Sequence, residues 1–338
     1  NSNNSNNSNN SNNSNNNNVA ANPLWSKRNK RLLIAVTLVV LVAVIVGIVV
    51  AVVAPGSGKE SLRDRLILFV SPHAPFTSFE DATSPQSQAL GWLQGDIIYT
   101  KTELLSYQRF LQRFALATMF YSLGRGSVLE HTHECGWGGD SLVVECDIDS
   151  NVVQLYTISS GQISGTIPPE LALLTRLESI DFDSNLLAGS IPPQLSSLTR
   201  LTFLDLWDNQ LTGSIPPQLS SLTSLDVFDL SKNMLTGVIP PQLSTLTALT
   251  WHSIDTNQLT GTIPPQLSKL SALRVLSFSF NQLTGTIPTE LSTLTALTTL
   301  YLAANQLTGT VPSGLCAIGI PEFAVDLATV ECACCSCC

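Results

Sequence analysis

The segment LTGSIPPQLSSLTSLDVFDLSKNM, residues 211–234, recurs along this chain with a period of 24 residues. One asparagine marks each unit, at Asn185, Asn209, Asn233, Asn257, Asn281 and Asn305. A fixed period in this range is typical of a solenoid, in which one structural unit stacks on the next. A solenoid presents a long ordered surface without an inherent catalytic cleft, so the repeat favours binding over chemistry.

Each unit predicts a short strand, a turn and an outer segment. The pattern L-x-x-L-x-L-x-x-N, as at Leu201, Leu204, Leu206 and Asn209, has two alternating inner leucines and so indicates a strand with one buried face. The asparagine follows the strand and can bond the turn backbone, so that successive asparagines would form an internal ladder. In the L-T-G-x-I-P-P that follows, Gly permits a tight bend and Pro stops regular pairing. Three leucines at spacing three then predict a short 3₁₀-like turn.

The predicted fold class is therefore an α/β right-handed solenoid, with parallel strands on its concave face and short 3₁₀ or irregular segments on its convex side. Six full units run from 163 to 306. A partial unit precedes them, in which we expect Val153, Tyr156, Ile158 and Gly161 at the leucine and asparagine positions. A truncated unit, LTGTVPSGL, ends at residue 315. His252 stands at a leucine position and is expected to be a partly buried core histidine.

The rest of the chain divides by composition. Residues 1–31 are rich in Asn and Ser, lack apolar surface to bury and are predicted to be disordered up to a basic cluster, KRNKR. Residues 32–54 contain no charge and are long enough to cross a bilayer core of about 30 Å as one transmembrane helix. We predict a stalk at 55–65, an N-terminal cap region at 66–151, repeats at 152–315 and a Cys-rich C-terminal cap or tail at 316–338. Within the cap region, residues 101–123 show helical spacing, with Thr102 as N-cap and Gly124 as stop.

Charge and cysteine usage indicate the orientation of this arrangement. Four basic residues precede the uncharged segment, which by the positive-inside rule predicts a single-pass protein of the plasma membrane with a cytoplasmic N-terminus and extracellular or lumenal repeats. The eight cysteines bracket the repeats at both ends, and disulfides there imply an oxidising compartment. The candidate disulfide cysteines are Cys135, Cys146, Cys316 and Cys332. The tail CACCSCC has metal binding or acylation as alternatives.

Other classes of function are disfavoured. The part after residue 54 carries 12 basic and 25 acidic residues, so nucleic acid is a poor partner. No HExxH, GxSxG or phosphate-loop motif is present, and we expect no enzyme activity, cofactor or metal. His131, His133, Cys135 and Cys146 form an alternative zinc-like set, in competition with a disulfide between cysteines.

The strand residues that alternate with the leucines should face outward in three columns. The columns are Ser179, Phe203, Val227, Trp251, Val275 and Thr299; then Asp181, Asp205, Asp229, Ser253, Ser277 and Tyr301; then Asp183, Trp207, Ser231, Asp255, Ser279 and Ala303. An aromatic and aliphatic stripe thus lies beside stacked carboxylates, which repel one another by a few tenths to about 1 kcal/mol per pair.

Exposed aromatic residues beside carboxylates often mark a binding site. We hypothesise an extended ligand with basic and apolar groups, held by Asp181, Asp205, Asp229, Phe203, Trp207, Trp251, Asp255 and Tyr301. Aspartate is also an ordinary residue at this position of the repeat, and part of the carboxylate column has that simpler interpretation.

The phrase LTGxIPPxLSxLTxLxxLxLxxNQ resembles the plant-type leucine-rich repeat of receptor-like proteins and receptor kinases, over about residues 150–315. The segment CGWGGDSLVVEC, 135–146, is similar to the paired-cysteine N-terminal cap of that family, which implies a Cys135–Cys146 disulfide. The layout of head, span, SPQSQALGWLQGD (84–96) and QRFALATMFYS (112–122) resembles the membrane-anchored leucine-rich repeat proteins of diatoms.

The resemblance implies recognition of a protein, peptide or glycan ligand. No kinase motif occurs, so signalling would require a co-receptor. A different class also fits: the regular column Thr212, Thr236, Thr260, Thr284 and Thr308 is of a kind that can engage ice or polysaccharide, or serve adhesion to wall material.

Overall fold

The computed structural model describes residues 61–75, 77–100, 107–126, 129, 133–137, 142–158 and 163–332. The chain divides into two units, Asn1–Ala51 and Val52–Cys338, and the described residues all belong to the second. The predicted disordered head and transmembrane segment at 32–54 lie outside the described residues. Among the residues that the structure describes, no helix is both long enough and apolar enough to span a bilayer.

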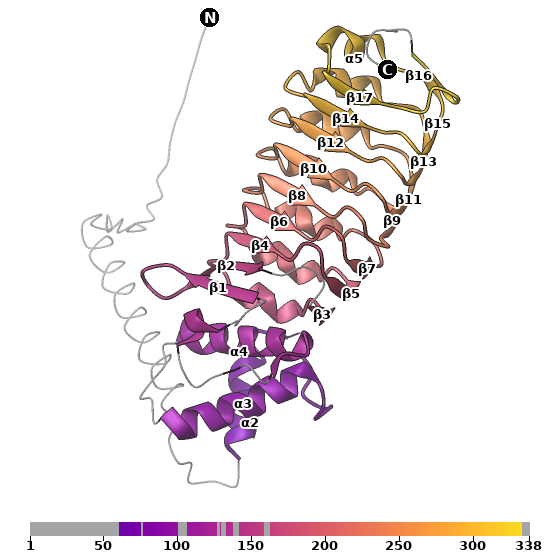
Figure 1. The fold of residues 1–338 in the computed structure, drawn as a ribbon. Coiled ribbons are helices and arrows are strands. Elements are labelled where there is room, and N and C mark those ends of the chain that lie inside the picture. Colours follow the sequence, from indigo (N-terminus) through magenta and orange to yellow (C-terminus); the bar gives the residue numbers. More distant parts are fainter. Residues whose placement is uncertain are drawn as a thin grey trace, which may run out of the picture. The chain divides into compact units, whose positions relative to one another are not determined.

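A nine-stranded sheet runs the length of the solenoid in the order β1-β2-β4-β6-β8-β10-β12-β14-β17, with the coils stacked in chain order (Figure 1). Its strands are β1 (Leu142–Cys146), β2 (Val152–Thr157), β4 (Ser179–Asp181), β6 (Phe203–Asp205), β8 (Val227–Asp229), β10 (Trp251–Ser253), β12 (Val275–Ser277), β14 (Thr299–Tyr301) and β17 (Glu322–Ala324). From β2 onward all pairs are parallel, whereas β1 pairs antiparallel with β2 and closes the N-terminal edge. We call the outward side of this sheet, the predicted concave face, the strand face.

The opposite side of each coil contains more strand than the sequence predicted. The 3₁₀ helices are η3 (Pro169–Leu173), η4 (Pro193–Ser197), η5 (Pro217–Ser221), η6 (Pro241–Thr245), η7 (Pro265–Lys269) and η8 (Thr289–Thr293). Short parallel strands β3 (Ser164–Thr166), β5 (Leu186–Ser190) and β7 (Gln210–Thr212) form one sheet. A second sheet contains β9 (Thr236–Val238), β11 (Gln258–Gly261), β13 (Gln282–Gly285) and β15 (Gln306–Leu307). The prediction of an irregular L-T-G segment was wrong because its backbone pairs with the preceding coil before the prolines begin.

The core consists of aliphatic rows that run through all coils. Leu219, Leu222 and Leu225, the three leucines of one outer turn, are fully buried, as predicted from their spacing. Replacing one such leucine by alanine costs about 2–5 kcal/mol in a packed core. Stacking therefore stabilises the solenoid mainly by burying these side chains against their equivalents in neighbouring coils.

The asparagine ladder is present and connects the coils through buried hydrogen bonds. The Oδ1 atom of Asn233 accepts from the Leu211 N–H at 2.9 Å, and its Nδ2 donates to the Leu206 carbonyl at 2.9 Å. Asn209, Asn257 and Asn281 repeat this pattern. At the C-terminal end Asp326 takes over, because its carboxylate accepts from the backbone N–H groups of Ala304 and Asn305.

The predicted positions in the first, partial unit were wrong by one residue. Leu155 pairs with Ile180, so the spacing at this coil is one position longer than the regular period. Val152 and Leu155 are consequently the buried residues, while Tyr156 lies on the strand face and Ile158 is 61% exposed. Because side chains alternate along a strand, one extra residue exchanges the two faces. Gly161 lies outside the described residues.

Three helices form the N-terminal cap: α2 (Leu62–Val70), α3 (Pro85–Thr100) and α4 (Tyr107–Ser122). Helix α2 begins within the predicted stalk, because Ser61 and Asp64 form a capping box at its start. Helix α4 corresponds to the predicted helix and ends before Gly124, whose φ of 67° is typical of a helix C-terminus. Residues 101–106, with the proposed N-cap Thr102, lie outside the described residues. Helix α4 packs on η3 and extends the solenoid core.

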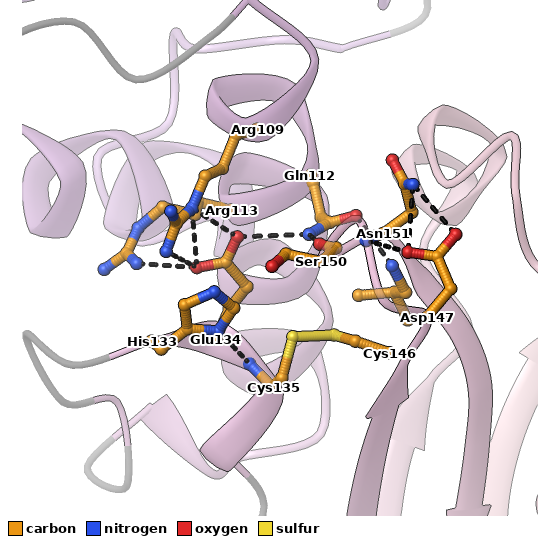
Figure 2. A network of polar contacts seen from close by, with 11 residues as sticks. Arg109, Gln112, Arg113, His133, Glu134, Cys135, Cys146, Asp147, Ser150 and Asn151 are labelled. Atoms are coloured by element: carbon orange, nitrogen blue, oxygen red, sulfur yellow. Dashed lines mark hydrogen bonds and ion pairs between the residues drawn. A yellow bond between two sulfur atoms is a disulfide. The ribbon is translucent and has the colours of Figure 1, made fainter.

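A buried carboxylate holds the cap together (Figure 2). Glu134 in η2 (Glu134–Gly136) is fully buried and accepts from Arg113 Nη1 at 2.8 Å, Arg109 Nε at 3.0 Å and Gln112 Nε2 at 3.1 Å. Burial opposes its charge, but the Arg109 hydrogen bond and both guanidinium charges keep the pKa of Glu134 below its ordinary value. Gln112 also accepts from the Val152 N–H at 2.8 Å, so the network connects α4 to β2.

Disulfides occur at both ends of the solenoid, as predicted. Cys135 and Cys146 are joined, with 5.7 Å between their Cα atoms, which excludes a zinc site built from both thiolates. Among the described residues, no group of three or more His, Cys, Asp or Glu side chains has a metal-binding arrangement. Cys316, in α5 (Ser313–Ile318), and Cys332 are also disulfide-bonded. Cys332 follows β18 (Val330–Glu331), which pairs with β16 (Gly309–Thr310).

His252 is fully buried at a leucine position, between two aromatic rings. Its ring stacks on Phe228 at 5.2 Å and meets Phe278 edge-on at 5.2 Å. The Nδ1 atom lies 3.4 Å from the Phe228 carbonyl, whereas Nε2 has no hydrogen-bond partner. Burial lowers the pKa of His252 to about 4.

We expect His252→Leu to raise the free energy of unfolding at pH 7 by about 1–3 kcal/mol, because it removes a buried polar atom without a partner. The contribution of His252 to wild-type stability should also decline as pH falls from 6.5 towards 4, since the unfolded histidine binds a proton that the folded one does not. Urea denaturation at pH 7 and pH 5 measures both effects. Equal stability of the two chains at both pH values would contradict this account.

Candidate ligand-binding face

The structure places the first two predicted columns in register on neighbouring strands, and the third column directly after those strands. Asp181 pairs with Asp205, Asp205 with Asp229, and Phe203 with Val227, which itself pairs with Trp251. In the third column, Trp207 lies beside Ser231, because the N–H of Asp208, the residue after Trp207, donates to the Ser231 carbonyl. The constant period of the repeat therefore predicted which side chains are neighbours across the strand face.

The stacked carboxylates are partly buried and mutually repelling. Asp205 and Asp229 each accept a hydrogen bond at 2.9 Å from the backbone N–H two residues later. Burial, and then the charges of Asp229, Asp181 and Asp183, raise the pKa of Asp205 to about 7. Burial raises the pKa of Asp181 and Asp229 as well. Ionising the carboxyl groups of this column therefore costs free energy.

Aromatic rings border the carboxylates. Trp251 is 42% exposed and donates from its indole Nε1 to Asp229 Oδ2 at 3.2 Å. The Trp207 ring is covered by an ammonium group, because Lys232 Nζ lies 4.2 Å from the ring centroid. Lys232 was not among the predicted site residues, although it follows Ser231, the residue that occupies the Trp207 position in the next coil.

A hollow of about 410 Å³ brings most of the predicted site together. Its lining includes the predicted residues Trp207, Asp229, Trp251, Asp255 and Tyr301. Asp181, Asp205 and Phe203 lie beside it on β4 and β6, on the same face but not in the lining.

One acidic residue of the hollow was not predicted. Glu322 accepts from the Tyr301 hydroxyl at 2.7 Å and from the Thr299 hydroxyl at 3.2 Å. It lies on β17, after the last full unit, and so no periodic signal in the sequence identifies it.

A larger hollow of about 550 Å³ lies where α4 meets η3 and η4. Its lining is made of aliphatic and uncharged polar side chains together with His73 and Arg176. It lacks the exposed tryptophan and the carboxylates of the strand face among its lining residues. We therefore regard the strand face, not this hollow, as the candidate site.

We expect Asp205→Asn to raise the free energy of unfolding by about 1 kcal/mol at pH 8, the scale of a like-charge cross-strand pair. The contribution of Asp205 to wild-type stability should decline as pH rises from about 4 through 7, because folded Asp205 retains a proton that the unfolded residue has released. The difference between variant and wild type should therefore vanish near pH 4. Urea denaturation at pH 4 and pH 8 tests this, and a variant that is less stable at pH 8 would contradict it.

Comparisons with known proteins identify the type of repeat. Family models match residues 176–198 (Leucine Rich Repeat), 199–250 (Leucine Rich repeats, 2 copies) and 253–307 (Leucine rich repeat). A search of curated proteins found no match. The repeats at 176–307 are thus leucine-rich repeats, and the fold is a leucine-rich repeat solenoid with parallel strands.

Several solved structures are similar to this chain. The PEPR1–AtPEP1 crystal structure has 34% sequence identity and a TM-score of 0.55, and the match covers 60% of this chain and 28% of that one. The Arabidopsis receptor kinase HAESA ectodomain, in complex with an extended IDA peptide hormone ligand, has 30% identity and a TM-score of 0.49, covering 62% and 38%. A plant ice-binding protein has 27% identity and a TM-score of 0.49, covering 64% and 86%. The match spans less than a third of the PEPR1 chain.

Proposed function

We propose that this leucine-rich repeat protein binds a basic segment of a protein or peptide on its strand face. The observation that carries the proposal is the hollow in which Trp207 and Trp251 border the carboxylates of Asp229 and Asp255. Carboxylates form charge-assisted hydrogen bonds with ammonium and guanidinium groups, and tryptophan rings attract the same cations. Tryptophan is also enriched among the residues that dominate binding energy at interfaces.

A cation of the protein itself already occupies part of this surface. Lys232 Nζ lies over the Trp207 ring at 4.2 Å, a distance at which a cation is attracted by the ring quadrupole. A ligand cation would find a ring and a carboxylate together at Trp251 and Asp229, whose side chains are hydrogen-bonded to each other. This internal contact supports a basic ligand over a neutral glycan.

The proposal extends to location and signalling. An uncharged segment at 32–54 would tether the chain to the plasma membrane as a receptor-like protein, with the strand face outside the cytosol. The Cys135–Cys146 disulfide supports an oxidising compartment. The proposal includes a signalling co-receptor as a further partner of the chain.

Selection of peptides from a random-sequence display library on the full chain tests the proposed ligand class. We expect the selected peptides to combine Lys or Arg with apolar residues. Their affinity should fall at least tenfold, about 1.4 kcal/mol, for the double variant Asp229→Asn, Asp255→Asn, because two charge-assisted contacts are lost. The matched control is Glu290→Gln, Glu331→Gln, which removes the same charge from exposed carboxylates away from the strand face.

Peptides without basic residues, or equal affinity for the two double variants, would contradict the proposal. A loss of binding by both variants would point to net charge instead of the site. Circular dichroism and thermal denaturation of each variant establish that the fold is retained before binding is compared.

A second function, binding of ice or polysaccharide, has one favourable observation. Thr236, Thr260 and Thr284 are exposed on the consecutive strands β9, β11 and β13. Each hydroxyl donates to a glycine carbonyl of the preceding coil at 3.2–3.3 Å, which orders the row. Thermal hysteresis of the purified chain separates the two functions: our main proposal predicts none, and hysteresis abolished by Thr260→Val would replace it.

A further inference from the structure

Two aspartates on the strand face are connected through two buried serines. Ser231 Oγ lies 2.6 Å from Asp229 Oδ1 and 2.5 Å from Ser253 Oγ, and Ser253 Oγ lies 2.9 Å from Asp255 Oδ1. The serines are 1% and 3% exposed, respectively, so water does not complete their hydrogen bonds. We call Asp229, Ser231, Ser253 and Asp255 the Asp–Ser chain.

The Asp–Ser chain contains one hydrogen bond more than its hydroxyl protons can supply. Three oxygen–oxygen contacts need three protons, and two serine hydroxyls provide two. If both carboxylates are ionised, each serine donates outward to its aspartate and the two hydroxyl oxygens face each other through lone pairs at 2.5 Å. One proton taken up from solvent by either carboxyl group removes this conflict.

With that proton, the hydrogen bonds run in one direction. A protonated Asp229 donates to Ser231, which donates to Ser253, which donates to the Asp255 carboxylate. The reverse order, starting from a protonated Asp255, satisfies the same contacts. The two orders differ only in which oxygen of each contact carries the hydrogen atom. The proton is therefore shared by the two aspartates and does not belong to one of them.

The surroundings favour retention of this proton. Asp205 on β6 lies next to Asp229 in the column, and Glu322 on β17 and Tyr301 on β14 line the same hollow. The cation over this part of the face, Lys232, is directed to the Trp207 ring. The indole N–H of Trp251 and the Ser231 N–H favour an ionised Asp229, while burial raises the pKa of that carboxyl group. Several carboxylates around one proton disfavour complete ionisation.

We propose that the Asp–Ser chain is a proton-binding site that holds one proton in the free protein and releases it when a basic group docks in the hollow. The second half of this statement rests on the proposed function. Proton and ligand cation then compete for the same carboxylates, and binding on the strand face strengthens as pH rises. The charge of the strand face therefore depends on pH and on whether a ligand is bound in the hollow.

The proton itself is tested without any ligand. In the full chain labelled with carboxyl-¹³C aspartate, nuclear magnetic resonance follows the Asp229 and Asp255 signals as pH is changed. We expect the two signals to move together, with the last proton leaving above the pH at which an ordinary aspartate titrates. Ser253→Ala should separate the two titrations and lower that midpoint. The control Ser277→Ala, at the equivalent position of the next coil, should change neither.

Ordinary, independent titration of both carboxyl groups in the wild-type chain would overturn the proposal, as would a Ser253→Ala variant with an unchanged midpoint. Coupling to ligand is measured by calorimetry with L-argininamide in two buffers of different ionisation enthalpy. Release of up to one proton per bound argininamide supports the coupling. Binding without proton release overturns it. Absence of argininamide binding would count against the proposed function, while the ligand-free titration decides the proton site separately.

Discussion

Glu134→Ala is expected to lower the free energy of unfolding by about 3–5 kcal/mol, the range found when one partner of a buried ion pair is removed. The variant removes the Glu134 carboxylate from the guanidinium of Arg113, which is 3% exposed and lies against the rings of Trp92 and Trp137. It also removes one of the two acceptors of the Gln112 amide; the other is the Ser150 carbonyl, through which Gln112 connects α4 to the β1–β2 turn (Figure 2). Urea denaturation at pH 7 measures the loss.

The control for this variant is Glu178→Ala, because Glu178 is exposed and an exposed substitution of this kind usually changes stability by less than about 0.5 kcal/mol. The contribution of Glu134 should also decline as pH falls, since its folded pKa is below the ordinary value and protonation breaks the network. If Glu134→Ala and Glu178→Ala have the same stability, the cap is not held by this carboxylate.

Asn233→Ala should cost about 1–3 kcal/mol, because it leaves the buried Leu211 N–H without its acceptor. The Leu206 carbonyl loses one of its two side-chain donors and keeps the other, Asn209 Nδ2, at 3.2 Å; both affected groups lie in the preceding coil. The loss therefore acts between coils, where a solenoid has its cooperativity. Thermal and urea denaturation of the full chain measure it.

Two other variants calibrate this result. Asn305→Ala should cost less, since Asn305 is half-buried at the last full coil and Asp326 already caps its backbone N–H. Gln258→Ala, an exposed residue in a neighbouring coil, should leave stability within about 0.5 kcal/mol of wild type. Equal losses for all three variants would show that the asparagine ladder does not connect the coils.

Much of the strand face could be predicted because the period is constant. Equal spacing of the units places Asp205 beside Asp229 and Val227 beside Trp251 without knowledge of any side-chain conformation. The same rule fails at the partial unit, where the pairing of Leu155 with Ile180 includes one extra residue and no asparagine marks the position. Periodicity therefore predicts which side chains are neighbours on adjacent strands of the regular repeats, but it does not predict the strand register of the first, partial repeat.

Other features depend on conformations that a repeat pattern does not contain. The Asp–Ser chain requires particular rotamers of Ser231, which follows β8, and Ser253, which lies on β10 in a different column. Glu322 follows the last unit, and the capping box that starts α2 at Ser61 lies in a segment whose composition resembles a linker. The short L-T-G strands were missed because glycine and proline ordinarily interrupt pairing, whereas here the paired residues precede the prolines.

The most direct test of the central claim is hydroxyl-radical footprinting of the full chain, with and without a peptide selected from the display library. The oxidation rates of Trp207 and Trp251 on the strand face are compared with those of Leu173 at the cap hollow and Val238 on the sheet of short strands. We predict that the bound peptide protects both tryptophans and leaves Leu173 and Val238 unchanged. Protection of Leu173 or Val238, with unchanged oxidation of Trp207 and Trp251, would place recognition elsewhere and contradict the account.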